Sequence, residues 1–149
     1  MKIIMLMLAA AVAVVLALGL YKTLTPPDHL YASTGEFAGC PSRPSCVSSV
    51  AGDDDHRVAA LAHTGDTLRA VSMLREVIER MGGEVKHADG GYLHAVFTTP
   101  RMRYRDDLEL LVHADGRIDV RSISRFGYRD FGVNRTRVEE LRRGFEAMP

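Results

Sequence analysis

The sequence predicts an α+β domain, a two-layer sandwich of an antiparallel four-stranded sheet and two covering helices, with a transmembrane helix in front of it. Two observations indicate this fold. Apolar residues recur with helical spacing at both ends of the domain, and four segments between them have strand-like patterns separated by short turn signals. An antiparallel sheet must bury one face, and the two helices are the only cover that this order (α-β-β-β-β-α) offers.

The chain begins with an apolar run from Ile3 to Leu20 that contains no charged side chain. About 18 residues with a rise of about 1.5 Å each give roughly 27 Å, just enough to cross the hydrocarbon core of a bilayer. We therefore expect residues 1–22 to form a transmembrane signal anchor. The alternative is a cleaved signal peptide with Ala17-Leu18-Gly19 as its cleavage site, but the length of the run favours retention.

The next segment, residues 23–38, is predicted to be a tether. It contains Pro26-Pro27 and the small polar run Ser33-Thr34-Gly35, and it offers no periodic apolar face. Extended polyproline geometry would hold the domain away from the membrane. Residues 39–149 are then expected to form the soluble α+β domain, which begins with a cysteine loop.

Cys40 and Cys46 are the only cysteines of the chain. An isolated pair six positions apart, in a loop-like stretch, is typical of a disulfide in a secreted or periplasmic domain, and a zinc site needs more ligands. Lys2 and Lys22 flank the apolar run and nearly balance the positive-inside rule. The cysteines therefore decide the expected topology: a single-pass protein of the bacterial inner (plasma) membrane, with the C-terminal domain on the periplasmic side.

The first helix of the domain is expected to begin at Asp66 or Thr67, either of which can cap it, and to end near Met81 before Gly82-Gly83. Strands are expected at residues 84–87, 92–99, 108–112 and 118–123. Glycine-containing turns separate the first two and the last two, and Pro100 ends the second. The last helix is expected to be capped by Asn134. The apolar positions of the two helices are Leu68, Val71, Leu74, Ile78 and Met81 in the first, and Val138, Leu141 and Phe145 in the second.

Composition excludes some classes of function. The formal net charge is zero, whereas a general nucleic-acid binder needs a basic surface that releases phosphate counterions. His87, His94 and His113 fall on three predicted strands and could be cross-strand neighbours, but they lack the spacing of a recognised metal site. We expect no metal and no cofactor.

The strongest polar concentration lies between residues 121 and 137, where the last strand, a glycine-containing loop and the last helix meet. A helix N-terminus presents free N–H groups, and arginines beside it could bind a carboxylate or a phosphate. The alternative is an internal network in which Arg121 or Arg125 pairs with Asp106, Asp107, Glu109 or Asp130. The candidate anion-binding residues are Arg121, Ser122, Ser124, Arg125, Tyr128, Asp130, Asn134 and Arg137.

No catalytic motif is evident. The serines lack a nucleophile-elbow context, and no glycine-rich phosphate loop is present. A hydrolase could use Asp106, Asp107 and Glu109 as paired carboxylates, but the adjacent Asp106 and Asp107 would point to opposite faces of a strand. The basic and apolar residues 101–105 could contact anionic lipid or a partner, or form a solvated loop. Whether the protein is an enzyme stays open, and a non-catalytic role is favoured.

Three segments resemble the domain-of-unknown-function 1499 (DUF1499) family. They are Cys40-Pro-Ser-Arg-Pro-Ser-Cys46-Val-Ser-Ser49, Asp107-Leu-Glu109, and residues 121–137 with Gly127-Tyr-Arg-Asp-Phe-Gly-Val-Asn-Arg135. The resemblance covers residues 39–142 approximately. The family occurs in bacteria and in plastids, often behind a membrane anchor or a targeting peptide, and it has no established activity. The resemblance implies that the cysteine loop belongs to the domain.

These observations together favour a membrane-anchored envelope domain that binds a partner protein or a small acidic ligand without catalysis, for example as an accessory subunit of a membrane complex. Its expected partners are the membrane, through the N-terminal helix, and a membrane protein or acidic ligand, but no nucleic acid. The alternative is a hydrolase-like envelope enzyme that uses an arginine-rich pocket for an anionic substrate.

Overall fold

The computed structural model describes residues 2–100 and 103–149. Its helices are α1 (Lys2–Leu24), the one-turn α2 (Tyr31–Thr34), α3 (Thr67–Arg80) and α4 (Val133–Glu146). Its strands are β1 (Cys46–Ser48), β2 (Leu61–Ala62), β3 (Glu84–Asp89), β4 (Tyr92–Thr98), β5 (Arg105–Val112) and β6 (Arg117–Ser124).

The strands form one antiparallel sheet in the order β1-β6-β5-β4-β3. Strand β2 also pairs with β6, along the same edge as β1 but at the first two residues of β6. The predicted α+β class and the antiparallel sheet are confirmed. The predicted number of elements, four strands and two helices in the domain, is wrong, because the described chain has six strands and a further short helix, α2. With three and two residues, β1 and β2 are too short to show the alternation that marks a strand in the sequence.

One face of the sheet is covered by α3 and α4, as the sequence predicted. The apolar stripes of the two helices pack on alternate residues of β4, β5 and β6, including Leu93, Leu108 and Val120. Asp66 caps α3 by accepting a hydrogen bond from the backbone N–H of Arg69, as expected. The cap predicted for α4 is wrong: the N-cap residue is Gly132, and Asn134 lies inside the first turn.

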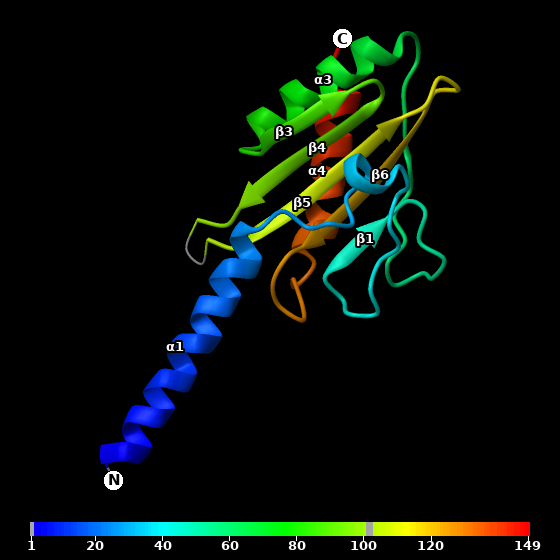
Figure 1. Ribbon diagram of the computed structural model, residues 1–149. Coiled ribbons are helices and arrows are strands. Elements are labelled where there is room, and N and C mark those ends of the chain that lie inside the picture. The colour runs from blue at the N-terminus through cyan, green and yellow to red at the C-terminus, as the bar shows by residue number, and fades with distance from the viewer. Residues whose placement is uncertain (1, 101–102) are drawn as a thin grey trace.

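The second face of the sheet is covered as well, which the sequence analysis did not predict. Figure 1 shows the segment after α1 crossing the front of the sheet, while α4 lies behind it. Within this segment, Leu30 is only 6% exposed and the ring of Tyr31 lies 4.9 Å from that of Tyr92. The segment expected to be a tether therefore lies against the sheet for part of its length. Below we call residues 26–40 the strap.

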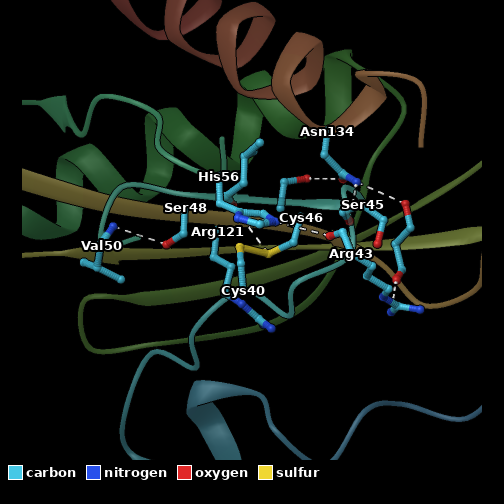
Figure 2. Close-up of a disulfide and its surroundings, with 12 residues drawn as sticks. Cys40, Arg43, Ser45, Cys46, Ser48, Val50, His56, Arg121 and Asn134 are labelled. Carbon is cyan, nitrogen blue, oxygen red and sulfur yellow. Dashed lines mark hydrogen bonds between the residues drawn. A yellow bond between two sulfur atoms is a disulfide. The ribbon is translucent and has the colours of Figure 1, made fainter. Parts of the chain in front are cut away.

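The disulfide between Cys40 and Cys46 is present, as predicted. It closes the loop that leads into β1, and this loop is held to α4 because Asn134 donates a hydrogen bond to the carbonyl of Ser45 over 3.1 Å (Figure 2). The cysteine loop is thus held to the folded domain by α4 and by the strand β1 that follows it.

Among the described residues, one helix is long and apolar enough to cross a membrane, over Lys2–Tyr21, and a signal sequence would have the same properties. The helix projects from the domain (Figure 1). Its large apolar side chains are exposed. Its C-terminal end touches the domain: a Cβ added at Gly19 would lie 3.2 Å from the ring of Phe126, and Arg105 donates to the carbonyl of Leu24.

Candidate functional site

The predicted anion-binding cluster is divided between the two faces of the sheet. Strand β6 alternates, so Ser122 and Ser124 lie on the face that α4 covers, where both hydroxyls contact Asn134. Arg121 lies on the strap-covered face, where it binds Glu109, the residue opposite it on β5. The predicted residues therefore do not form one site.

On the helix side, the N-terminus of α4 is already occupied by a carboxylate of the chain itself. Asp130 accepts hydrogen bonds from the backbone N–H groups of Gly132 (3.1 Å) and Asn134 (2.9 Å), and from the Asn134 side chain. These are the groups that an external anion would have needed. Because they are bonded to Asp130, this end of the cluster is an internal capping network.

Arg137 completes that network. Its guanidinium donates to Asp106 over 2.6 Å, to the amide oxygen of Asn134 and to the hydroxyl of Ser122, and it stacks on the ring of Phe97 at 4.7 Å. Both charges of the Arg137–Asp106 pair are nearly buried. A buried Arg with this many partners of its own chain is not available to a ligand.

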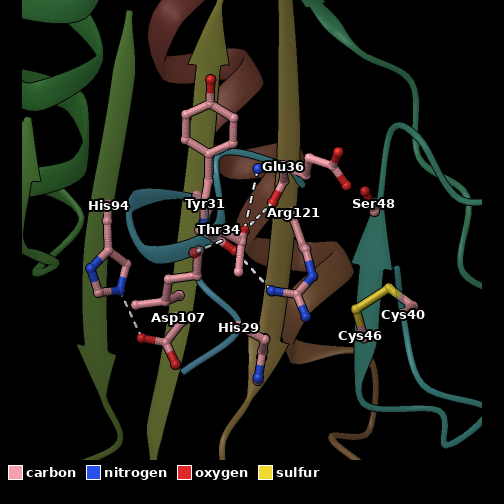
Figure 3. Close-up of polar contacts among 12 residues, drawn as sticks. His29, Tyr31, Thr34, Glu36, Cys40, Cys46, Ser48, His94, Asp107 and Arg121 are labelled. Carbon is pink, nitrogen blue, oxygen red and sulfur yellow. Dashed lines mark hydrogen bonds and ion pairs between the residues drawn. A yellow bond between two sulfur atoms is a disulfide. The ribbon is translucent and has the colours of Figure 1, made fainter. Parts of the chain in front are cut away.

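The strap-covered face carries two buried ion pairs. The first joins Arg121, 1% exposed, to the fully buried Glu109 over 2.7 Å. Glu109 also accepts from the hydroxyl of Tyr92 and from the backbone N–H of Tyr31 in the strap. Figure 3 shows the Arg121 side chain between the strap and the disulfide. The Nε of Arg121 finds no acceptor among the described residues, which leaves one buried donor unsatisfied.

The second pair centres on Asp107, which is completely buried. Arg125 donates to both of its oxygens over 2.8 Å, and Nε2 of His94 lies 2.7 Å from one of them (Figure 3). Burial by itself would raise the pKa of Asp107, but the hydrogen bonds from Arg125 and His94 outweigh it and hold the pKa below its usual value. Asp107 is therefore an ionised carboxylate with two fixed partners.

A pocket of about 410 Å³ opens beside this pair, between the sheet and the C-terminal end of α1. Asp107 and Arg125 line it from the sheet, and Arg43 lines it from the cysteine loop. Tyr21, from the last turns of α1, and His29, from the strap, line the other side. Of the predicted cluster, Ser124 and Arg125 contribute to this pocket; Arg43 and His29 were not predicted.

Tyr128 lies apart from these groups, with 73% of its surface exposed on the loop after β6. His94, which the sequence analysis considered only as a metal ligand, is instead the partner of Asp107, although it does lie opposite His87 as the strand pattern suggested. His113 likewise bonds to Asp119. Over residues 2–100 and 103–149, no three His, Cys, Asp or Glu side chains gather in a group that could hold a metal ion.

Another histidine–carboxylate pair lies near the disulfide. Nδ1 of His56 is 2.6 Å from Asp53, and its Nε2 faces the carbonyl of Arg43 over 3.3 Å. The hydrogen bond with Asp53 raises the pKa of His56 and lowers that of Asp53. Figure 2 shows His56 beside the cysteine loop, so this pair helps to position the loop that carries Arg43.

We compared the chain with known proteins. The comparison with curated proteins found no match, and the comparison with solved structures found none either. One family model matches residues 36–145, from the end of the strap to the last turn of α4. The chain therefore belongs to the family described as "Protein of unknown function (DUF1499)".

Proposed function

We propose that the protein is a membrane-anchored envelope domain that binds an acidic ligand, without catalysis, in the pocket between the end of α1 and the strap-covered face. The observation that supports this proposal is the placement of Arg43 and His29 around that pocket. Carboxylate and phosphate are the groups that a guanidinium binds best in such a position.

Arg43 and Arg125 are matched in number by Asp28 and Asp107 in the pocket lining, so the case for an anion rests on which groups are already paired. The charge of Arg125 is offset by Asp107. Arg43 donates to the carbonyls of Ser124 and Gly127, and it pairs with no carboxylate among the described residues. His29 contributes a buried Nε2 atom that has no hydrogen-bond partner there. Asp28 also lines the pocket, and its carboxylate lies 3.7 Å from Nδ1 of His29. The groups that can donate to an anion are therefore the guanidinium of Arg43 and Nε2 of His29.

The residues around the pocket favour binding over chemistry. Ser124, the serine of the pocket lining, already accepts a hydrogen bond from the Asn134 side chain through its hydroxyl. The buried carboxylate Asp107 is fixed by two partners and is therefore a poor candidate for proton transfer. The same pocket would bind an acidic group of a partner protein, and such a contact is what an accessory subunit needs.

The test is native mass spectrometry of the full-length protein, released gently from its own membrane. We expect a bound small acid or an acidic partner that is lost in Arg43→Gln and retained in Arg75→Gln. Arg75 is a matched control, because it is a partly exposed arginine on α3 that makes only a 3.9 Å surface contact. A bare wild-type protein that also fails to bind inorganic phosphate or acetate at millimolar concentration would refute the ligand proposal. A pull-down in mild detergent that returns only this polypeptide would refute the partner version.

We further propose that α1 is retained as a single-pass anchor in the bacterial inner membrane, with the domain on the periplasmic side. The disulfide supports an oxidising compartment, and the length of α1 supports retention. Extraction of cell membranes with alkaline carbonate should leave the protein in the membrane fraction. Protease added to spheroplasts should degrade the domain; a protected domain would refute this orientation.

A hydrolase-like enzyme is the second candidate, and the buried His94–Asp107–Arg125 arrangement favours it. An ionised carboxylate beside a histidine can orient that histidine as a base, although no nucleophile accompanies it among the described residues. Turnover of p-nitrophenyl acetate or phosphate that His94→Gln abolishes, with an unchanged unfolding transition, would support this candidate. If His94→Gln only unfolds the domain, the arrangement is structural.

A further inference from the structure

The loop after β6, residues 125–132, lies at the end of the domain from which α1 emerges. Phe126 packs on α1 at Gly19, and its ring lies 5.4 Å from that of Tyr104 in the β4–β5 loop. Gly19 is inside the apolar stretch Lys2–Tyr21 that could cross a membrane. If α1 spans a bilayer, Phe126 must therefore lie beside its last apolar turns, at the level of the lipid headgroups.

The same loop exposes two further aromatic side chains. Tyr128 is 73% exposed, and Phe131, at 89%, is the most exposed large hydrophobic residue among those described. Phe131 also has a φ of 56°, which is uncommon for a bulky residue. Exposed aromatic side chains, one of them on a residue with an unusual backbone conformation, are typical of a surface that contacts another molecule.

The two loops that carry these aromatic residues also carry exposed basic residues. Arg129 in the same loop and Arg103 in the β4–β5 loop are exposed, whereas Arg101 and Met102 lie outside the described residues. The nearby carboxylates Asp107 and Asp130 are already bonded within the chain. The exposed carboxylates Asp55 and Glu140 line hollows beside Phe131, on the side of the loop that faces α4. Proteins that contact a membrane surface are rich in tyrosine at the level of the headgroups and in arginine near the lipid phosphates.

We propose that this end of the domain sits in the headgroup layer of a phospholipid bilayer, with Tyr128 and Phe131 inserted between headgroups and Arg103 and Arg129 beside lipid phosphates. The inference rests on α1 as a retained anchor, but it does not depend on a ligand in the pocket. It means that the domain lies on the membrane instead of standing away from it on a tether, and that the pocket lined by Tyr21 opens beside lipid.

The chain contains no tryptophan, so a single Trp reports its own surroundings. The experiment uses full-length Tyr128→Trp and Phe131→Trp, each reconstituted into vesicles of phosphatidylcholine and phosphatidylglycerol. Quenching by lipids with brominated acyl chains is compared with quenching by aqueous iodide. Leu68→Trp is the matched control, because Leu68 is a 65% exposed apolar residue on α3, which Figure 1 shows far from α1.

We expect brominated lipid to quench Trp at position 128 or 131 several-fold more than at position 68, and iodide to show the opposite order. If Trp at both loop positions behaves as at position 68, the inference is wrong. Carbonate extraction of the same variants keeps the two proposals distinct. If the protein stays in the membrane while iodide quenches Trp at both loop positions, the proposal that the loop lies in the headgroup layer is wrong, and the proposal that α1 is a retained anchor stands. Protein that is extracted would refute both.

Discussion

Replacing Glu109 with Leu should destabilise the domain more than almost any other single change. The substitution leaves the guanidinium of Arg121, which is 1% exposed, without its 2.7 Å partner. Removing one member of a buried ion pair costs about 3–5 kcal/mol, because the remaining charge stays buried and unpaired. The hydroxyl of Tyr92 and the backbone N–H of Tyr31 lose their acceptor too, which adds about 1 kcal/mol or more for each donor that stays buried.

The assay is urea unfolding of the full-length protein in a mild detergent, followed by circular dichroism. The matched control is the double variant Glu109→Leu/Arg121→Met, which removes both charges and keeps similar volumes. Replacing a whole buried pair with apolar residues is often neutral or stabilising, so the double variant should recover most of the loss. If Glu109→Leu alone unfolds at the same urea concentration as the double variant, Arg121 is not a buried, unpaired charge in the single variant, and the reasoning fails.

Three other changes test separate parts of the structure. Replacing both Cys40 and Cys46 with Ser should lower the free energy of unfolding by about 2 kcal/mol, the loop-entropy estimate for so short a loop. An unchanged urea midpoint would mean that Pro41 and Pro44 already restrict the loop without the disulfide. The hydrogen bonds on Asp107 lower its pKa in the folded state despite its burial, so its contribution to stability is present above the usual Asp pKa of about 4 and is lost as pH falls through the lower folded value. The urea midpoint of the wild type should therefore fall more steeply below about pH 4 than that of Asp107→Asn, and equal slopes would assign the acid sensitivity to other groups. A Cβ at Gly144 would lie 2.6 Å from Cγ1 of Val77, so Gly144→Ala should cost about 1–3 kcal/mol; in a double-mutant cycle with Val77→Ala, strictly additive losses would show that the two residues do not touch.

The helix-covered half of the fold could be predicted because its signals are local. The Asp66 cap and the apolar spacing of α3 indicate a helix without any knowledge of the rest of the chain. The alternation of β5 and β6 also correctly predicts which residues face the helices. Strands β1 and β2 could not be predicted, since their few residues pair only because β6 is already in place.

The strap-covered face was missed for a different reason. Residues such as Asp107, Glu109 and Arg121 alternate with Leu108 and Val120, a pattern that normally marks a face open to water. Here the charged side chains neutralise one another in pairs. The strap that covers them has too few apolar residues to form a pattern that would predict its burial. The same alternation, applied to residues 121–125, would have shown that the arginines and the serines of the predicted cluster lie on opposite faces.

Arg125 connects the end of α1 to the buried face of the sheet. Two of its nitrogens bind Asp107, and Nη1 donates to the carbonyl of Thr25, one residue beyond α1. Arg105 donates in the same way to Leu24. A change in how α1 meets the domain therefore acts directly on the wall of the pocket, because Tyr21 of α1 lines that wall and Arg125 bonds to Thr25 directly after α1. Under the two proposals, membrane attachment and ligand binding are coupled through Tyr21 and Arg125 and not through a flexible linker, which makes the position of the domain on the membrane part of the site.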